Sequence, residues 1–142
     1  MASEYEKFEK AVGKIRETNN AYLTEFSQWL KDKGLAAKTI DNHVTNVEFY
    51  INEFLCYDDA LDVKQGCYQV SQFLGDWFIR KTTWASCGNI KSNAASIKKF
   101  YAFLLEKGVI RQEDFDELRE TIKDEMPDWL EIMRQDEEID YN

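Results

Sequence analysis

The sequence has few of the residues that break helices or build covalent and metal sites. Its 142 residues include one proline and six glycines, a scarcity that favours long helices over a fold of many strands. The three cysteines form no Cys-x-x-Cys pair, so we expect reduced thiols rather than a zinc site or a disulfide framework. No apolar run reaches the roughly 18 residues that a membrane-spanning helix needs, so we expect no membrane-spanning segment.

A targeting segment is also missing from the pattern. The first ten residues, MASEYEKFEK, contain no apolar stretch of the kind found in secretory signals. Together with the expected reduced thiols, this predicts a cytoplasmic protein. Hydrophobic residues make up 44% and aromatic residues 14% of the chain, which is enough for a packed core in a chain of this length.

Catalytic motifs are absent as well. There is no glycine-rich phosphate loop, no metal-ligand spacing and no nucleophile beside a base. The single histidine, His43, falls at the edge of an apolar stripe and is interpreted as a core-border residue. We therefore predict a protein that is not an enzyme and that has no cofactor and no metal.

The charge of −9 is distributed unevenly. Residues 1–35 are neutral, residues 36–80 carry −4, residues 81–110 carry +4 and residues 111–142 carry −9. The distribution is more informative than the total, because the last segment alone accounts for the whole imbalance. Residues 81–110 are where we expect a surface for a polyanion.

Apolar residues recur at helical spacing along most of the chain. The pattern predicts helices over residues 4–16, 20–33, 37–56, 68–81 and 88–107, one starting at residue 112, and a short last helix starting at Pro127. Residues 18–20 and Ser86 are expected to cap helices, and Gly34 and Gly108 to end them. Residues 135–142 are expected to be an acidic, mobile tail.

The order of these elements resembles a known domain. Seven short motifs follow one another along the chain: Leu23-x-x-Phe26-x-x-Trp29-Leu30, Gly34-Leu35-Ala36, Thr39-Ile40, Val47-x-x-Tyr50-Ile51, Phe54-Leu55, Ser96-Ile97-Lys98-Lys99-Phe100-Tyr101-x-Phe103-Leu104 and Gly108-Val109-Ile110. Over about residues 20–110 they resemble the N-terminal core-binding domain of tyrosine recombinases and phage integrases. The resemblance implies an all-α, SAM-like orthogonal bundle of four core helices. We expect it to span residues 1–111 with an N-terminal helix, followed by an acidic helical extension over residues 112–142.

In that family the domain forms one half of a clamp around duplex DNA. The resemblance places DNA-binding positions at Lys38, Thr39, Asn42 and Asn46 on one helix, and at Asn89, Lys91, Ser92, Ala95, Lys98 and Lys99 on another. Lysines neutralise phosphates, while serine, threonine and asparagine hydrogen-bond phosphates or base edges. The family's catalytic domain has no counterpart after residue 110. The resemblance thus implies a non-catalytic module that associates weakly with double-stranded DNA in recombination or a mobile element.

An alternative hypothesis stays open, in which the protein is a regulatory remnant that binds a protein partner instead of DNA. Its candidate contacts are Phe49, Phe103, Trp129, Leu130 and Met133, which the sequence pattern leaves outside the main core. The acidic extension could also cover the lysines and suppress binding.

The tryptophans Trp29, Trp77 and Trp84 are interpreted as core residues at helical spacing and not as platforms for base stacking.

Overall fold

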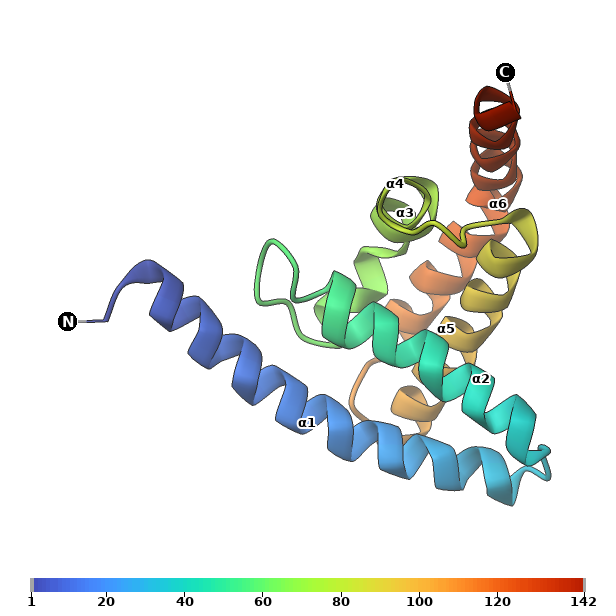
Figure 1. Ribbon diagram of the computed structural model, residues 1–142. Helices are drawn as coiled ribbons and strands as arrows, with labels where there is room; N and C mark the ends of the chain where they lie inside the picture. The colour runs from blue at the N-terminus through green and yellow to red at the C-terminus, as the bar shows by residue number, and fades with distance from the viewer. Residues whose placement is uncertain (1, 142) are drawn as a thin grey trace. The chain divides into compact units, whose positions relative to one another are not determined.

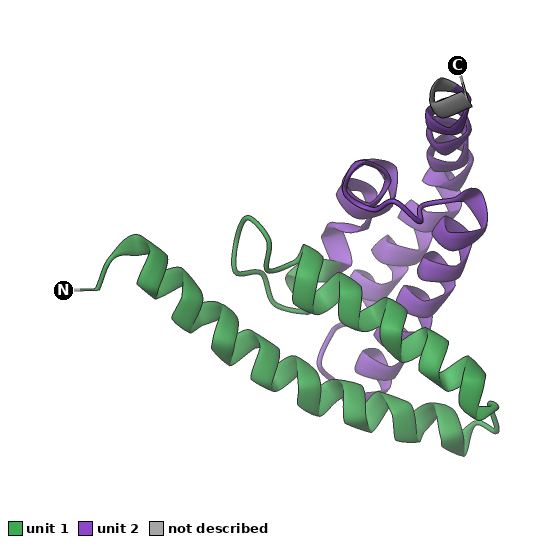
Figure 2. Cartoon of the chain, in the orientation of Figure 1, with its two compact units in different colours: residues 1–66 green, residues 67–142 purple. Residues whose placement is uncertain are grey.

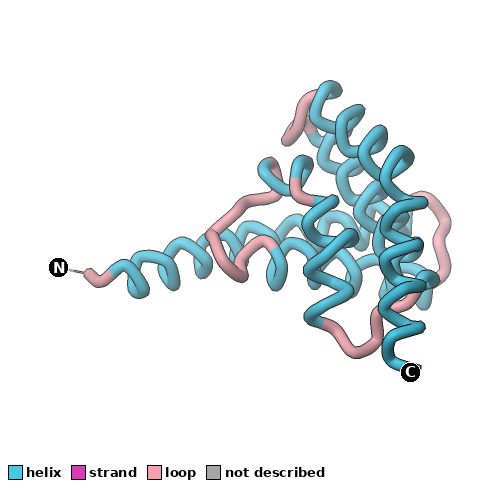
Figure 3. Tube along the Cα trace, turned by 90° about the horizontal axis from the view of Figure 1, so that it is seen from above, coloured by secondary structure: helices cyan, strands magenta, loops and turns pink. Residues whose placement is uncertain are grey.

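The computed structural model describes residues 2–141, with side chains described for residues 2–138. Every regular element in that part of the chain is helical, which confirms the predicted all-α class (Figure 3). The chain divides into two compact units, Met1–Gly66 and Cys67–Asn142 (Figure 2). Within residues 2–141, every helix falls short of the length and apolarity that crossing a membrane requires.

The first unit begins with one long helix, α1 (Glu4–Asp32), where two helices were predicted (Figure 1). The expected cap at residues 18–20 is wrong, because Asn19 lies within the helix and is only 2% exposed. Its side-chain amide donates to the carbonyl oxygen of Ile51 and to Oδ1 of Asn52. Residues far away in the sequence therefore accept the hydrogen bonds of the Asn19 side chain, so this side chain does not cap a helix.

The second helix of this unit, α2 (Ala37–Glu48), follows the turn at Gly34 and packs along α1. Gly34 has φ 86°, a left-handed conformation that glycine adopts without a Cβ penalty, so the predicted helix end is confirmed. A π-helix, Phe49–Phe54, continues α2. Together they span nearly all of the helix predicted over residues 37–56.

Polar side chains join the π-helix to α1. Arg16 on α1 donates from Nε and from a terminal guanidinium nitrogen to the carbonyl oxygen of Asn52, at 3.1 and 2.9 Å. The Asn52 side chain donates in turn to Oδ1 of Asn20. These bonds satisfy the polar groups and fix α1 against the π-helix, since buried backbone groups are costly when left unpaired.

The second unit opens with a helical rod made of α3 (Val70–Gln72), a π-helix (Phe73–Trp77) and α4 (Phe78–Lys81). A 3₁₀ turn, Gln65–Tyr68, leads into it. The rod covers most of the helix predicted over residues 68–81.

The next helix, α5 (Cys87–Lys107), begins and ends where the sequence indicates. The Ser86 hydroxyl accepts from the backbone N–H of Asn89, which is the predicted cap. Gly108 follows the helix with φ 83°, the left-handed conformation expected of a helix-ending glycine.

The last helix, α6 (Gln112–Tyr141), is continuous, although a separate helix was predicted from Pro127. Pro127 is exposed and lies inside α6. Ile122 and Trp129 are buried on either side of it, so the apolar stripe keeps its phase through the proline. The tail expected to be mobile from residue 135 is helical through Tyr141, and Asn142 lies outside the described residues.

Helix α6 packs against both α5 and the 70–81 rod within the second unit. Leu118, Ile122 and Trp129 are at most 4% exposed. The Ser71 hydroxyl donates to the Glu125 carboxylate at 2.9 Å, which joins the rod to α6. Residues 112–142 therefore contribute core to this compact unit, while their predicted status as an extension separate from residues 1–111 stays a prediction.

Candidate nucleic-acid interface

The first set of predicted DNA-binding residues lies on α2, in the first unit. Lys38, Thr39 and Asn42 are exposed, and Asn46 is half-buried. Lys38 is the only lysine or arginine of α2, whose exposed face also carries the carboxylates of Asp41 and Glu48. This surface consequently offers hydrogen-bonding groups but little positive charge.

The second set lies on α5, in the second unit. Lys91, Ser92, Lys98 and Lys99 are exposed, and Asn89 and Ala95 are partly exposed. The opposite face of the helix is buried through Ile90, Ala94, Ile97, Tyr101 and Leu104. The helical spacing thus presents three lysines, which we call the α5 lysine face (Lys91, Lys98 and Lys99), to solvent.

The two polar residues of this set form hydrogen bonds within α5 and the loop before it. The Asn89 side-chain amide donates to the carbonyl oxygen of Trp84 at 2.6 Å, so it holds the start of α5. The carbonyl of Ser92 accepts from the hydroxyl of Ser96. The lysines are therefore the principal groups that the helix offers to a polyanion.

Within the described residues, the lysines of the α5 lysine face lie outside the ion pairs. Among the described residues, no carboxylate forms an ion pair with Lys91, Lys98 or Lys99. By contrast, Arg80 donates two hydrogen bonds to Asp76, at 2.7 and 3.0 Å, and these lower the pKa of the Asp76 carboxyl. A lysine without an acidic partner keeps its charge available for an anion.

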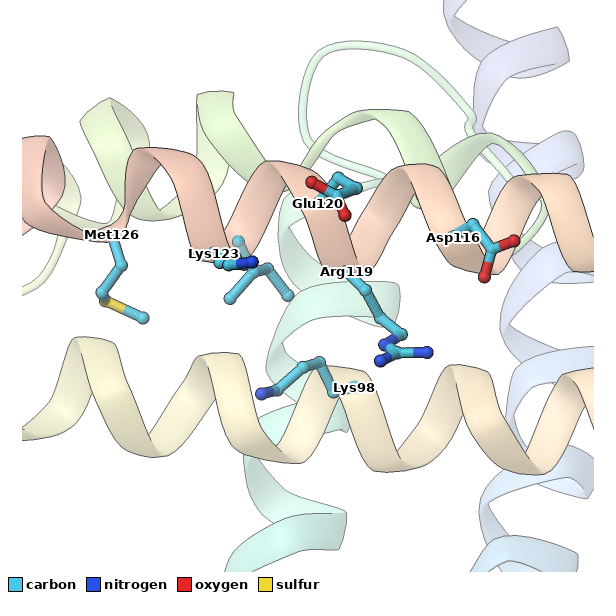
Figure 4. Close-up of a pocket in the computed structure, with 7 residues that line it drawn as sticks. Lys98, Asp116, Arg119, Glu120, Lys123 and Met126 are labelled. Atoms are coloured by element: carbon cyan, nitrogen blue, oxygen red, sulfur yellow. The ribbon is translucent and has the colours of Figure 1, made fainter.

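A groove beside this face contains cations that the sequence reasoning missed. It lies between α5 and α6 (Figure 4). Its volume is about 650 Å³. Lys98 lines it from α5, and Arg119 and Lys123 line it from α6. Its remaining lining residues are Asp116, Glu120, Ile122 and Met126.

A helical wheel of α6 could have revealed these cations. Arg119, Lys123 and Arg134 fall within about 60° of the helix circumference at 3.6 residues per turn. Asp116 and Glu120 line the groove as well, whereas most of the other exposed acids lie on another side of α6: Glu113, Glu117, Asp124, Asp128 and Glu131. The charge of −9 summed over residues 111–142 conceals this separation, because the sum does not show which face of the helix each charge lies on.

The described residues contain free thiols but no cluster that could hold a metal ion. Within residues 2–141, no three His, Cys, Asp or Glu side chains come together in a way that could hold a metal ion. All three cysteines are free thiols, and burial raises the pKa of the Cys56 thiol. A raised pKa disfavours the thiolate, which is the reactive form.

Most contacts expected for a protein partner are buried instead. Phe103, Trp129, Leu130 and Met133 are between 2 and 8% exposed, so their predicted role as surface contacts is wrong. They lie on the apolar stripes of α5 and α6, which pack against each other. Phe49 is half-buried.

The expectation for the three tryptophans holds in part. Trp77 is buried and Trp29 is half-buried, but Trp84 is 56% exposed and is not a core residue. Trp84 lies in the loop before α5, whereas Trp29 and Trp77 lie within helical segments.

No protein-family model, curated protein or solved structure matches the chain. The charges and contacts described above therefore have to carry any functional assignment.

Proposed function

We propose that this protein is a non-catalytic module that associates weakly with duplex DNA through the α5 lysine face. The observation that carries the proposal is that Lys91, Lys98 and Lys99 are exposed on one helix without acidic partners among the described residues. The relationship to the SAM-like core-binding domain of tyrosine recombinases, with a role in recombination or a mobile element, is part of the proposal. It is supported by the sequence pattern of residues 20–110.

The expected affinity follows from the number of cations. The three lysines, with Arg119 and Lys123 beside them, allow three to five phosphate contacts. Contacts of this number correspond to a dissociation constant of about 10⁻⁴–10⁻⁶ M without sequence specificity, and to a slope of log K against log salt of roughly −3 to −4.5. The acids of α6 weaken this attraction at low salt, but screening over about 8 Å at physiological ionic strength limits their reach.

The test requires the full chain. Removing residues 112–142 would take away Leu118, Ile122 and Trp129, whose burial helps to hold the second unit together. A truncated protein that failed to bind would therefore give no information about charge. Charge reversal on exposed positions avoids this difficulty, since it leaves the core intact.

We would measure the fluorescence anisotropy of a labelled 20-base-pair duplex at low salt, with wild type and with K91E/K98E/K99E. The matched control, K10E/K31E/K64E, reverses three exposed lysines of the first unit and changes the net charge equally. We expect the first variant to lose at least about tenfold in affinity and the control to lose much less. Absence of binding by wild type, or equal losses in both variants, would refute the DNA assignment.

The alternative function as a protein-binding remnant has less support. Four of its five candidate contacts are core residues, and exposed aromatic side chains such as Trp84 and Tyr57 are explained by the ordinary composition of protein surfaces.

A further inference from the structure

The groove between α5 and α6 gathers cations from two helices. Lys98 reaches it from α5, whereas Arg119 and Lys123, one helical turn apart, reach it from α6. In Figure 4 the side chains of Lys98 and Arg119 enter the space between the two helices, and that of Met126 does so further along α6. Three positive side chains thus face one concave surface.

These cations do not pair with the acids that share the groove. Asp116 precedes Arg119 by three residues, and Glu120 precedes Lys123 by three, a spacing at which ion pairs form readily on helices. Among the described residues, Lys98, Arg119 and Lys123 nevertheless form no ion pair. Their positive charges are therefore not held in short contacts with carboxylates and stay available to a bound anion.

The arginine also contacts an aromatic ring. Its guanidinium carbon lies over the Phe115 ring, 5.5 Å from the centroid. Stacking on an aromatic ring orients the planar guanidinium, whose paired N–H groups match two oxygens of a phosphate. Lysines act as point charges and add attraction without this directional requirement.

We propose that this groove binds a phosphate group through Lys98, Arg119 and Lys123. The groove is larger than a phosphate alone, at about 650 Å³, and its wall includes the buried Ile122 and the half-buried Met126. It therefore has room for the organic part of a phosphate ester, and Asp116 and Glu120 can accept hydrogen bonds from hydroxyl or amino groups of that part. If the phosphate belongs to duplex DNA, this inference rests on the proposed function. If it is a free phosphate or a small phosphate ester, the inference stands independently of that function.

The experiment follows NMR signals of the Met126 methyl group and of the Arg119 Nε–H in the full-length protein. The probes are inorganic phosphate, adenosine monophosphate and a 12-base-pair duplex, each compared with sodium chloride at equal ionic strength. We expect all three probes to shift both signals, and the buried Met133 methyl to move less. R119Q/K123Q should weaken the binding of each probe by at least about tenfold, the effect of losing charge-assisted hydrogen bonds.

The matched control is K107Q/R134Q, which removes two positive charges from exposed residues of the same unit that do not line the groove. We expect it to change binding by no more than about twofold, since neither residue lines the groove. Unchanged circular dichroism in both variants would show that the fold is kept.

The outcomes separate this inference from the proposed function. Shifts with phosphate or adenosine monophosphate but not with the duplex would support the groove and refute the DNA assignment. Duplex binding that needs Lys91 and Lys99 but is unaffected by R119Q/K123Q, without a phosphate shift, would overturn the groove and leave the DNA assignment standing. The absence of NMR shifts with all three probes, or equal losses of affinity in the variant and the control, would also refute phosphate binding by the groove.

Discussion

Two glycines in helical segments have opposite surroundings. Gly75 lies in the π-helix of the rod, where an added Cβ would approach Cδ1 and Nε1 of Trp129 at 2.8 and 2.9 Å. Trp129 is 2% exposed, so its indole has little room to move away. Gly13 lies in α1 with nothing within 4 Å of the position of a Cβ.

The contrast predicts opposite effects of the same substitution. Gly75→Ala should lower the free energy of unfolding by about 1–3 kcal/mol through overpacking. Gly13→Ala should raise it by about 0.5–1 kcal/mol, because alanine is the better helix former. Urea unfolding of both variants measures the effects. Equal changes would show that Gly75 does not hold the rod close to α6.

A second residue-scale feature is the pair Tyr68 and Asp114. The Tyr68 hydroxyl donates to the Asp114 carboxylate, and this hydrogen bond is the main cause that raises the pKa of Tyr68 to about 12. The same bond, with the backbone N–H of Arg111, lowers the pKa of the Asp114 carboxyl. Because the phenol pKa is raised on folding, its contribution to stability is present below about pH 10 and is lost as the pH rises toward 12.

Asp114→Asn should return the Tyr68 pKa toward its ordinary value of about 10. The side-chain carbon signal of Tyr68, followed by NMR between pH 8 and pH 12, reports the ionisation. Glu113→Gln is the control, since it removes a neighbouring carboxylate that does not contact Tyr68. A Tyr68 titration that is the same in wild type and Asp114→Asn would contradict the hydrogen bond.

At the scale of elements, α1 and α6 are each longer than the sequence pattern suggests. Asparagine and proline both favour helix boundaries when local preferences alone are considered. In α1 the cross-helix partners of Asn19 outweigh that preference, and in α6 the apolar residues on both sides of Pro127 pack in one stripe. Tertiary contacts therefore decide where these helices continue.

Pro127→Ala distinguishes a continuous α6 from two helices. Alanine restores the backbone N–H that would donate to the carbonyl of Lys123 and removes the ring clash, so we expect stabilisation by about 1–3 kcal/mol. Asp128→Ala, at the next exposed position, should change stability by less than about 0.5 kcal/mol. Urea unfolding measures both. A neutral or destabilising Pro127→Ala would instead place a helix start at the proline.

At the scale of the molecule, charge is sorted by helix face rather than by segment. Residues 111–142 carry −9, yet the cations Arg119 and Lys123 of α6 line the same groove as Lys98 of α5. The proposed interface in the second unit thus combines a helix from the basic segment with one flank of a helix from the acidic segment. A sum of charges along the sequence would instead assign a positive surface to α5 and a negative surface to α6.

The sequence alone determined the all-α class, the start of α5 at Ser86 and the helix ends at Gly34 and Gly108. Each depends on interactions within a few residues, such as a capping hydroxyl or a left-handed glycine, so local sequence suffices. Only the tertiary structure decided the burial of Asn19, the continuity of α6 through Pro127 and the groove that brings Arg119 beside Lys98. These features join residues far apart in the chain, and helical periodicity shows which face of a helix is apolar but not which helix covers it.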